Sequence, residues 1–274
     1  MAKRINLEDR RKVKALLYGL PGAGKTRLAC SAALVGAMSP VLYLHASGNP
    51  ESIIEYENYP DMIEVEDLED VNAPYAWLHM GQPLDHPFPK MFGLDHGGEN
   101  PYKTVIVDQI TDIQEIAFRK LLRQGQVSER LPGSFFRKRE WDDYNKVLYQ
   151  GMEFAELFYG LNMHVIMCAW EKAIDKDKYP GSAAIMPMLE GRGTVGVPGK
   201  ANLVGRIQPV QMVNPGLLEA VNKDLDRRGY ESIEHNIVFW RSNKQYLAKN
   251  QLSQALGSYM ADPTMGEIWE LLNQ

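Results

Sequence analysis

Residues 13–26, VKALLYGLPGAGKT, decide the fold of this 274-residue chain. VKALLY is a short β-prone run, and GLPGAGKT at residues 19–26 matches the pattern G-x-x-x-x-G-K-[ST] at every fixed position. An Ala-rich helical pattern follows, from about Lys25 to Gly36. Because a strand, this glycine-rich turn and a helix form a phosphate-binding P-loop in that order, the stretch predicts a nucleotide-binding α/β domain.

The P-loop residue types explain how a phosphate would be held. The three glycines let the backbone curl so that several N–H groups point into one concavity, and the positive end of the following helix adds to the attraction. Lys25 is expected to reach the β- and γ-phosphates, and the Thr26 hydroxyl to ligate magnesium. The predicted ligands are ATP and Mg²⁺, and the predicted nucleotide contacts are Gly19, Pro21, Gly22, Ala23, Gly24, Lys25, Thr26 and Arg27.

Later strand ends supply the remaining catalytic candidates. YKTVIVD at 102–108 is an apolar run ending in an acid, typical of a strand buried on both faces, and Asp108 is predicted to be the second magnesium residue. An Asp that only caps the next helix is the alternative. Gln109 directly after it, and Trp170 and Glu171 after a later strand, are candidates for positioning the attacking water or sensing the γ-phosphate. Solvated side chains at the rim are the competing interpretation.

The rest of the chain alternates strand and helix patterns up to residue 169, which predicts a largely parallel sheet with helices on both faces. The C-terminal strands have no helices between them and predict an antiparallel extension of that sheet. Residues 81–101 are rich in Pro and Gly and are expected to form a loop insertion within one domain spanning 1–274. Further strands are expected at 40–45, 62–67, 163–169, 203–213, 235–240 and 245–248, and helices at 50–57, 111–124, 141–159 and 263–272.

Composition limits the functional classes. The sequence contains no run of about 18 apolar residues, so no membrane-spanning helix is expected. The N-terminus lacks the apolar core of a signal peptide, and only two cysteines are present. The predicted setting is therefore the cytoplasm. The net charge of -5 argues against a purely electrostatic nucleic-acid binder. Two Asp–His pairs, 85–86 and 95–96, carry only a weak metal signal, and the other histidines, among them His45, are interpreted as structural.

One segment departs from the acidic average. Residues 119–139 carry seven Lys or Arg against one acid, Glu129. Aromatic side chains stack on bases and cations follow phosphates, which is how proteins hold single strands without reading sequence. The part at 125–139 is therefore a candidate DNA-binding loop, with an ordinary solvated loop as the equal alternative. Its candidate DNA contacts are Phe135, Phe136, Arg137, Lys138 and Arg139.

Taken in order, the P-loop, the strand ending in Asp108, the helix EWDDYNKV, the strand HVIMCAWEK and the segment reaching VPGKANLVGRI resemble one family. The family is that of the phage AAA/RecA-like nucleotide-binding proteins, the core-only relatives of the RecA/RadA recombinases. The resemblance covers about residues 12–250 and implies a RecA-like core and ATP-dependent single-strand annealing in DNA recombination. It also implies single-stranded DNA, a single-strand-binding protein and further copies of the chain, in a ring or filament, as partners. If the chain is phage-encoded, the implied setting is the cytoplasm of the bacterial host. DNA-facing loops are implied at about 125–139 and 172–200.

Two features depart from what the resemblance implies. RecA-like recombinases carry a catalytic Glu after the second strand, where this chain has Ser47, with Glu51 four residues on, so slow ATP hydrolysis is one expectation. Few residues precede the first strand, so the polymerisation segment of larger relatives is expected to be missing. Because ATP often lies between RecA-like subunits, Lys244 or Lys249 is implied as a cation acting on the neighbour's site.

Two other functions stay open at the sequence level. An ATP-switched assembly or loader protein, whose partner is another protein, would use the same nucleotide site to order a loop. The negative net charge and the acids concentrated in residues 51–70 favour that alternative slightly. A small-molecule kinase is the weaker alternative, since no paired-Arg lid segment is visible.

Overall fold

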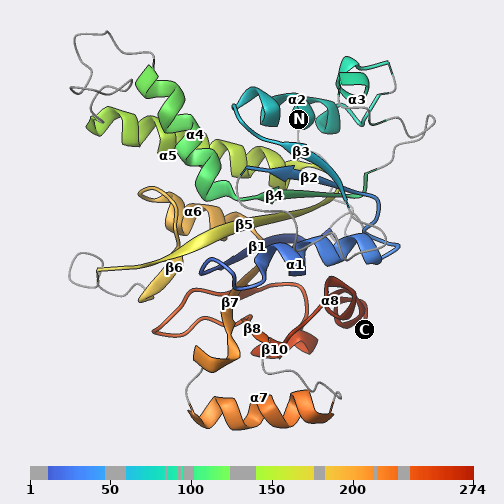
Figure 1. Ribbon diagram of the computed structural model, residues 1–274, viewed down its shortest axis with the longest axis vertical. Coiled ribbons are helices and arrows are strands. Elements are labelled where there is room, and N and C mark those ends of the chain that lie inside the picture. Colours follow the sequence, from blue (N-terminus) through green and yellow to red (C-terminus); the bar gives the residue numbers. More distant parts are fainter. Residues whose placement is uncertain are drawn as a thin grey trace, which may run out of the picture.

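The computed structural model describes residues 12–46, 60–83, 85–91, 94, 102–123, 140–175, 183–212, 215–227 and 235–274. Within these ranges one large sheet runs through the molecule (Figure 1). Its strands are β1 (Lys14–Gly19), β2 (Val41–His45), β3 (Asp61–Glu64), β4 (Thr104–Asp108), β5 (His164–Ala173), β6 (Ile185–Pro187), β7 (Leu203–Pro209), β8 (Asn236–Phe239), β9 (Lys249–Asn250) and β10 (Tyr259–Ala261).

The sheet is mostly parallel, as the alternation of patterns predicted. The strand order is β10-β8-β7-β1-β5-β4-β2-β3, and the six strands from β7 to β3 run parallel to one another. The strands β8, β10, β6 and β9 pair antiparallel, and three of the four lie in the C-terminal part of the chain. The expected fold class, a parallel α/β core with a C-terminal antiparallel extension, is therefore confirmed.

Helices cover both faces of the sheet (Figure 1). On one face α1 and α8 pack on the apolar side chains of β1, β2 and β5, and on the other face α2, α4, α5 and α6 bury a second set. The central strands are apolar on both sides because each face is covered. The helices are α1 (Lys25–Cys30), α2 (Glu69–His79), α3 (Pro87–Met91), α4 (Ile110–Arg123), α5 (Trp141–Gly160), α6 (Gly193–Lys200), α7 (Pro215–Arg227) and α8 (Met265–Leu272).

Several predicted boundaries are wrong. The helix expected at 25–36 leaves α-geometry after Cys30 and continues as a 3₁₀ turn at Ser31–Leu34. The loop expected at 81–101 contains α3, and the strand expected at 245–248 lies at β9 instead. The helix expected at 50–57 lies outside the described residues. Helix ends and short strands depend on tertiary contacts, so these are the boundaries that a local pattern fixes least.

Other elements were not expected from the sequence. The implied DNA-facing loop at 172–200 holds the end of β5, β6 and α6, with residues 176–182 outside the described part. Helix α6 contains three glycines and Pro198, so its local propensity is poor. Its small residues allow close packing on α5, because a Cβ at Gly196 would lie 2.9 Å from Met152 Cε. Helices α2 and α7 and strand β10 were also missed.

The order and register of the strands fix where the functional residues meet. Gly19 ends β1 and pairs with Trp170 of β5, while Asp108 ends β4 and pairs with Cys168 of β5. Since β5 lies between β1 and β4, the P-loop and Asp108 come out at the same carboxyl edge of the sheet. Ligands of open α/β sheets bind at this edge.

Candidate nucleotide site

The loop from Gly19 to Lys25 has backbone conformations and a close strand contact that require glycine. Gly22 and Gly24 have φ angles of 76° and 83°, in the left-handed region that residues with a Cβ rarely adopt. At Gly19 a Cβ would lie 2.2 Å from the carbonyl oxygen of Ile207, so only glycine fits between β1 and β7. Pro21, Gly22 and the following Arg27 are exposed, which leaves the outer side of the loop open to a ligand.

Lys25 lies inside the loop rather than in solvent. Only 4% of the residue is exposed, and its Nζ donates to the carbonyl oxygens of Gly19 at 3.1 Å and Leu20 at 2.9 Å. Burial lowers the pKa of Lys25, while Asp108 and Glu171 are among the groups that act against this shift. The ammonium group is therefore held at the mouth of the P-loop, where a phosphate oxygen could replace a carbonyl partner.

Thr26 and Asp108 meet across the edge of the sheet. The Thr26 hydroxyl donates to Asp108 Oδ2 at 2.6 Å. Asp108 is 2% exposed, and its other oxygen, Oδ1, is buried without a hydrogen-bond partner. A hydroxyl and a carboxylate with a spare oxygen are the donors that Mg²⁺ prefers, and this ion takes its other ligands from phosphates and water. The two residues therefore fit a magnesium ion.

Within the described ranges, no cluster of three or more His, Cys, Asp or Glu residues could hold a metal by itself. The Asp85–His86 pair has no such cluster around it, and Asp95–His96 lies outside the described residues. Gln109 follows Asp108 through a cis peptide bond, and its side-chain oxygen is buried without a hydrogen-bond partner. Its suggested role in positioning water stays a prediction.

Glu171 was expected to follow a strand that ends at residue 169. It lies within the strand instead, because β5 continues to Ala173. Its carboxylate receives hydrogen bonds from Arg206 of β7, Nε to Oε2 at 2.9 Å and Nη2 to Oε1 at 3.2 Å. Arg206 also donates to Gln208 and lies 5.5 Å from the ring centre of Tyr246. The carboxylate of Glu171 is thus engaged in a buried ion pair, and its suggested role as a γ-phosphate sensor stays a prediction.

The two lysines implied to act on a neighbouring subunit differ in their surroundings. Lys249 Nζ donates to the carbonyl oxygens of Gly199 at 2.8 Å and Ala201 at 2.6 Å, so it joins β9 to the end of α6. Lys244 is exposed. The candidate DNA contacts Phe135–Arg139 and the two positions considered for a catalytic acid, Ser47 and Glu51, lie outside the described residues.

Sequence reasoning missed two residues of the site. Tyr43 is fully buried on β2, and its hydroxyl donates to Asp108 Oδ2 at 3.0 Å. The same hydroxyl lies 3.0 Å from Nδ1 of His45, which had been interpreted as structural. The sequence gives no signal for this contact, because it depends on the pairing of β2 with β4.

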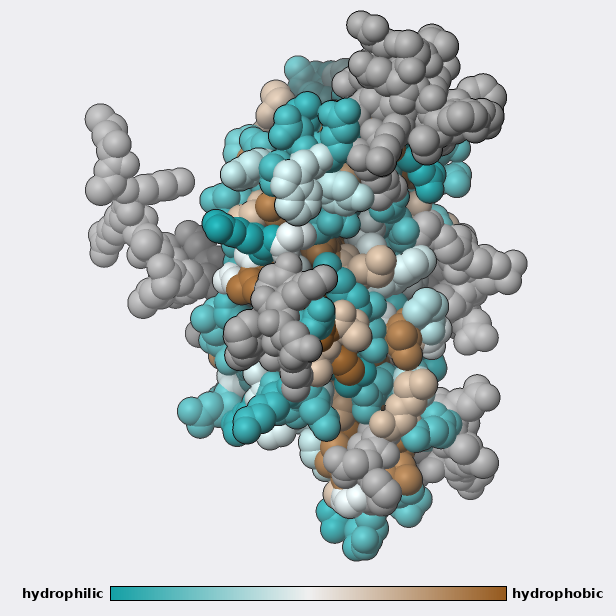
Figure 2. Space-filling view, turned by 90° about the vertical axis from the view of Figure 1, so that its left-hand side faces the viewer, coloured by the Kyte–Doolittle hydropathy of each residue, from teal (hydrophilic) through white to brown (hydrophobic). Residues whose placement is uncertain are grey.

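The carboxyl edge of the parallel strands faces left in Figure 1 and the viewer in Figure 2. The described surface there is mainly hydrophilic, with several separate hydrophobic patches (Figure 2). No helix in the described part of the chain has the length and apolar character needed to span a membrane.

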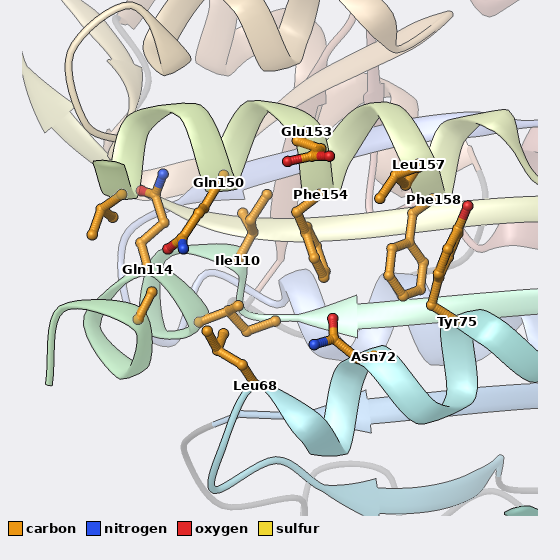
Figure 3. A pocket seen from close by; sticks show the side chains of 14 residues that line it. Leu68, Asn72, Tyr75, Ile110, Gln114, Gln150, Glu153, Phe154, Leu157 and Phe158 are labelled. Carbon is orange, nitrogen blue, oxygen red and sulfur yellow. The ribbon is translucent and has the colours of Figure 1, made fainter. Parts of the chain in front are cut away.

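A separate cavity of about 270 Å³ lies on the face of the sheet opposite α1, between α2, α4 and α5 (Figure 3). Its wall is mainly apolar, with Ile110, Phe154 and Phe158 in it. Gln114 also lines it and accepts a hydrogen bond from the backbone of Glu190 at 3.2 Å. The sheet lies between this cavity and α1, the helix that follows the P-loop. The cavity is therefore not part of the nucleotide site.

The P-loop, the paired Thr26 and Asp108, and the parallel sheet together define a P-loop nucleotide-binding protein. The chain belongs to the AAA domain family, whose model matches residues 11–252. No curated protein matches it in sequence.

Three solved structures match this chain at low sequence identity. A DnaB-like replicative helicase studied for its interactions with primase is 13% identical with a TM-score of 0.36, over 88% of this chain and 54% of the helicase. This chain thus spans about half the length of that helicase. The ATPase domain of G40P is 13% identical, with a TM-score of 0.35, over 88% of this chain and 78% of the domain. The flagellar accessory protein FlaH from Methanocaldococcus jannaschii is 11% identical, with a TM-score of 0.31, over 85% of this chain and 83% of FlaH.

Proposed function

We propose that this chain binds ATP with Mg²⁺ at the P-loop and uses the bound nucleotide to control its association with single-stranded DNA in recombination or annealing. The observation that carries the nucleotide part is the meeting of Lys25, Thr26 and Asp108 at one edge of the sheet. Lys25 and the loop N–H groups would contact the phosphates, and Thr26 and Asp108 would hold the ion. Bound Mg²⁺ would supply charge neutralisation on the phosphate oxygens.

The DNA part of the proposal is supported by the basic segment and by a residue next to it. Trp141 begins α5 immediately after that segment and is 83% exposed. Figure 1 shows the end of α4 and the start of α5 together at one corner of the molecule. An exposed indole that follows a basic segment in the sequence can stack on a base, and the cations of that segment would contact phosphates. A ring or filament of several copies, with Lys244 reaching a neighbour, belongs to the same proposal.

The nucleotide part is tested by ligand-induced stabilisation. A ligand that binds only the folded chain raises its stability by RT ln(1 + [L]/Kd), about 2.7 kcal/mol at a hundredfold excess over Kd. We expect ATP with Mg²⁺ to raise the melting temperature of the wild type and to have little effect on Lys25→Ala. Lys223→Ala, which removes an exposed lysine of α7, is the control and should behave like the wild type. Equal stabilisation of Lys25→Ala and the wild type would contradict the site.

The DNA part is tested by binding of a fluorescent single strand at several salt concentrations, with and without ATP and Mg²⁺. Substitution of Arg137, Lys138 and Arg139 by Gln should weaken binding and flatten its salt dependence, because fewer counterions are released. Trp141→Ala should weaken binding with the salt dependence retained, and Tyr149→Ala, 70% exposed further along α5, is its control. A wild type that binds no DNA at low salt in either condition would refute this part and favour a protein partner.

A further inference from the structure

Two hydroxyl groups from different parts of the fold converge on one oxygen of Asp108. Thr26 donates to Oδ2 from α1 at 2.6 Å, and Tyr43 donates to the same atom from β2 at 3.0 Å. The other oxygen, Oδ1, is buried without a hydrogen-bond partner. Two donors on one side of the carboxylate fix its plane, so the free oxygen is presented in one direction.

The hydrogen-bond chain beyond Asp108 has a defined direction. The Tyr43 hydroxyl has one hydrogen and donates it to Asp108 Oδ2. His45 Nδ1, 3.0 Å from the hydroxyl, must then be the donor to the Tyr43 oxygen. The order is His45 to Tyr43 to Asp108.

Tyr43 and Thr26 differ in what they can do once nucleotide is bound. Thr26 follows the P-loop, and its oxygen is needed for the ion. Tyr43 is fully buried on β2, a strand hydrogen-bonded on both sides by β3 and β4. A contact from this interior strand would hold the carboxylate whether or not Thr26 shifts.

We propose that Tyr43 is a positioning residue that orients the Asp108 carboxylate for Mg²⁺, and that His45 in turn orients Tyr43. This inference rests on the proposed nucleotide and Mg²⁺ site. Groups that hydrogen-bond to a metal-binding carboxylate tune its affinity, and losing one typically weakens metal binding by about 10- to 100-fold.

The test separates Mg²⁺ binding from nucleotide binding. Tyr43→Phe removes only the hydroxyl and keeps the buried ring. Melting temperatures are measured with a non-hydrolysable ATP analogue at fixed concentration, first in EDTA and then over a Mg²⁺ titration. We expect Tyr43→Phe to need about tenfold more Mg²⁺ for half of the Mg²⁺-dependent stabilisation. The stabilisation in EDTA should match that of the wild type.

Tyr102→Phe is the matched control, because it removes a Tyr hydroxyl that donates to Asp61 at 2.7 Å, away from the P-loop. Its Mg²⁺ titration should match the wild type. An unchanged titration in Tyr43→Phe, or an equal loss of stabilisation in EDTA, would overturn the inference. A wild type with no nucleotide-dependent stabilisation at all would instead refute the proposed function.

A second pair of variants covers the case in which Tyr43→Phe fails to fold. His45→Leu removes the donor to Tyr43 and should raise the Mg²⁺ requirement, whereas His45→Asn places an N–H donor near the position of Nδ1 and should bring the Mg²⁺ requirement part of the way back to that of the wild type. If both variants titrate like the wild type, Tyr43 is not oriented in this way and the inference fails.

Discussion

The buried ion pair between Arg206 and Glu171 can be tested through its effect on stability. The side chains are 8% and 9% exposed and make two hydrogen bonds, so solvent screens the pair little. Arg206→Met would leave the Glu171 carboxylate buried without its cation. Breaking a buried pair on one side typically costs about 3–5 kcal/mol. Because domains are stable by only about 5–15 kcal/mol, the loss should be easy to measure.

The double variant Arg206→Met with Glu171→Leu removes both charges. Replacing a buried pair by apolar side chains is often close to neutral, so the double variant should lose less stability than either single variant. Urea unfolding followed by tryptophan fluorescence gives the free energy of each variant. Lys223→Met is the control, since its pair with Glu219 is 66% and 73% exposed and should be worth less than about 0.5 kcal/mol.

The same variants address the role suggested for Glu171 at the γ-phosphate. Arg206 occupies both carboxylate oxygens, so the ratio of ATP to ADP affinity should be the same in the folded double variant and the wild type. A single Arg206→Met loss below about 1 kcal/mol, or single losses that simply add, would refute the reasoning about the pair. A changed affinity ratio would instead assign Glu171 to phosphate sensing.

Two further predictions follow from close packing and from a buried histidine. Gly205→Ala should lower the free energy of unfolding by about 1–3 kcal/mol, because its Cβ would lie 2.5 Å from Trp240 Cζ3 and 2.9 Å from Val238 Cγ1, both in the buried core. Gly160→Ala meets nothing within 4 Å and should change little. Burial and nearby lysines lower the pKa of His164 to about 4, and its Nδ1 accepts a hydrogen bond from Val13 at 3.0 Å. As the pH falls, His164 is protonated in the unfolded chain before it is protonated in the folded chain. On the order of 3 kcal/mol of stability should therefore be lost between pH 6.5 and pH 4. Acid unfolding of His164→Gln should lack this loss.

The sequence predicted the core of the fold because its signals are local. The strand, glycine turn and helix around residues 13–30 have steric requirements that few other sequences meet. Short apolar runs such as 104–108 are typical of strands with both faces covered. The expected bounds of α4 and α5 were each within one residue of the observed ones. Helix α6 was missed because glycine and proline oppose its local formation, and only close packing on α5 stabilises it.

By itself the sequence determined the P-loop, the acid at the end of β4 and the parallel core, because each depends on neighbours along the chain. Only the tertiary structure decided which side chains meet. It placed Tyr43 and His45 beside Asp108 and paired Glu171 with Arg206. It also directed the Lys249 ammonium group to the carbonyl oxygens of Gly199 and Ala201 in the same chain. The physical reason is that strand order and register bring distant residues within 3 Å of each other, and no local pattern contains that information.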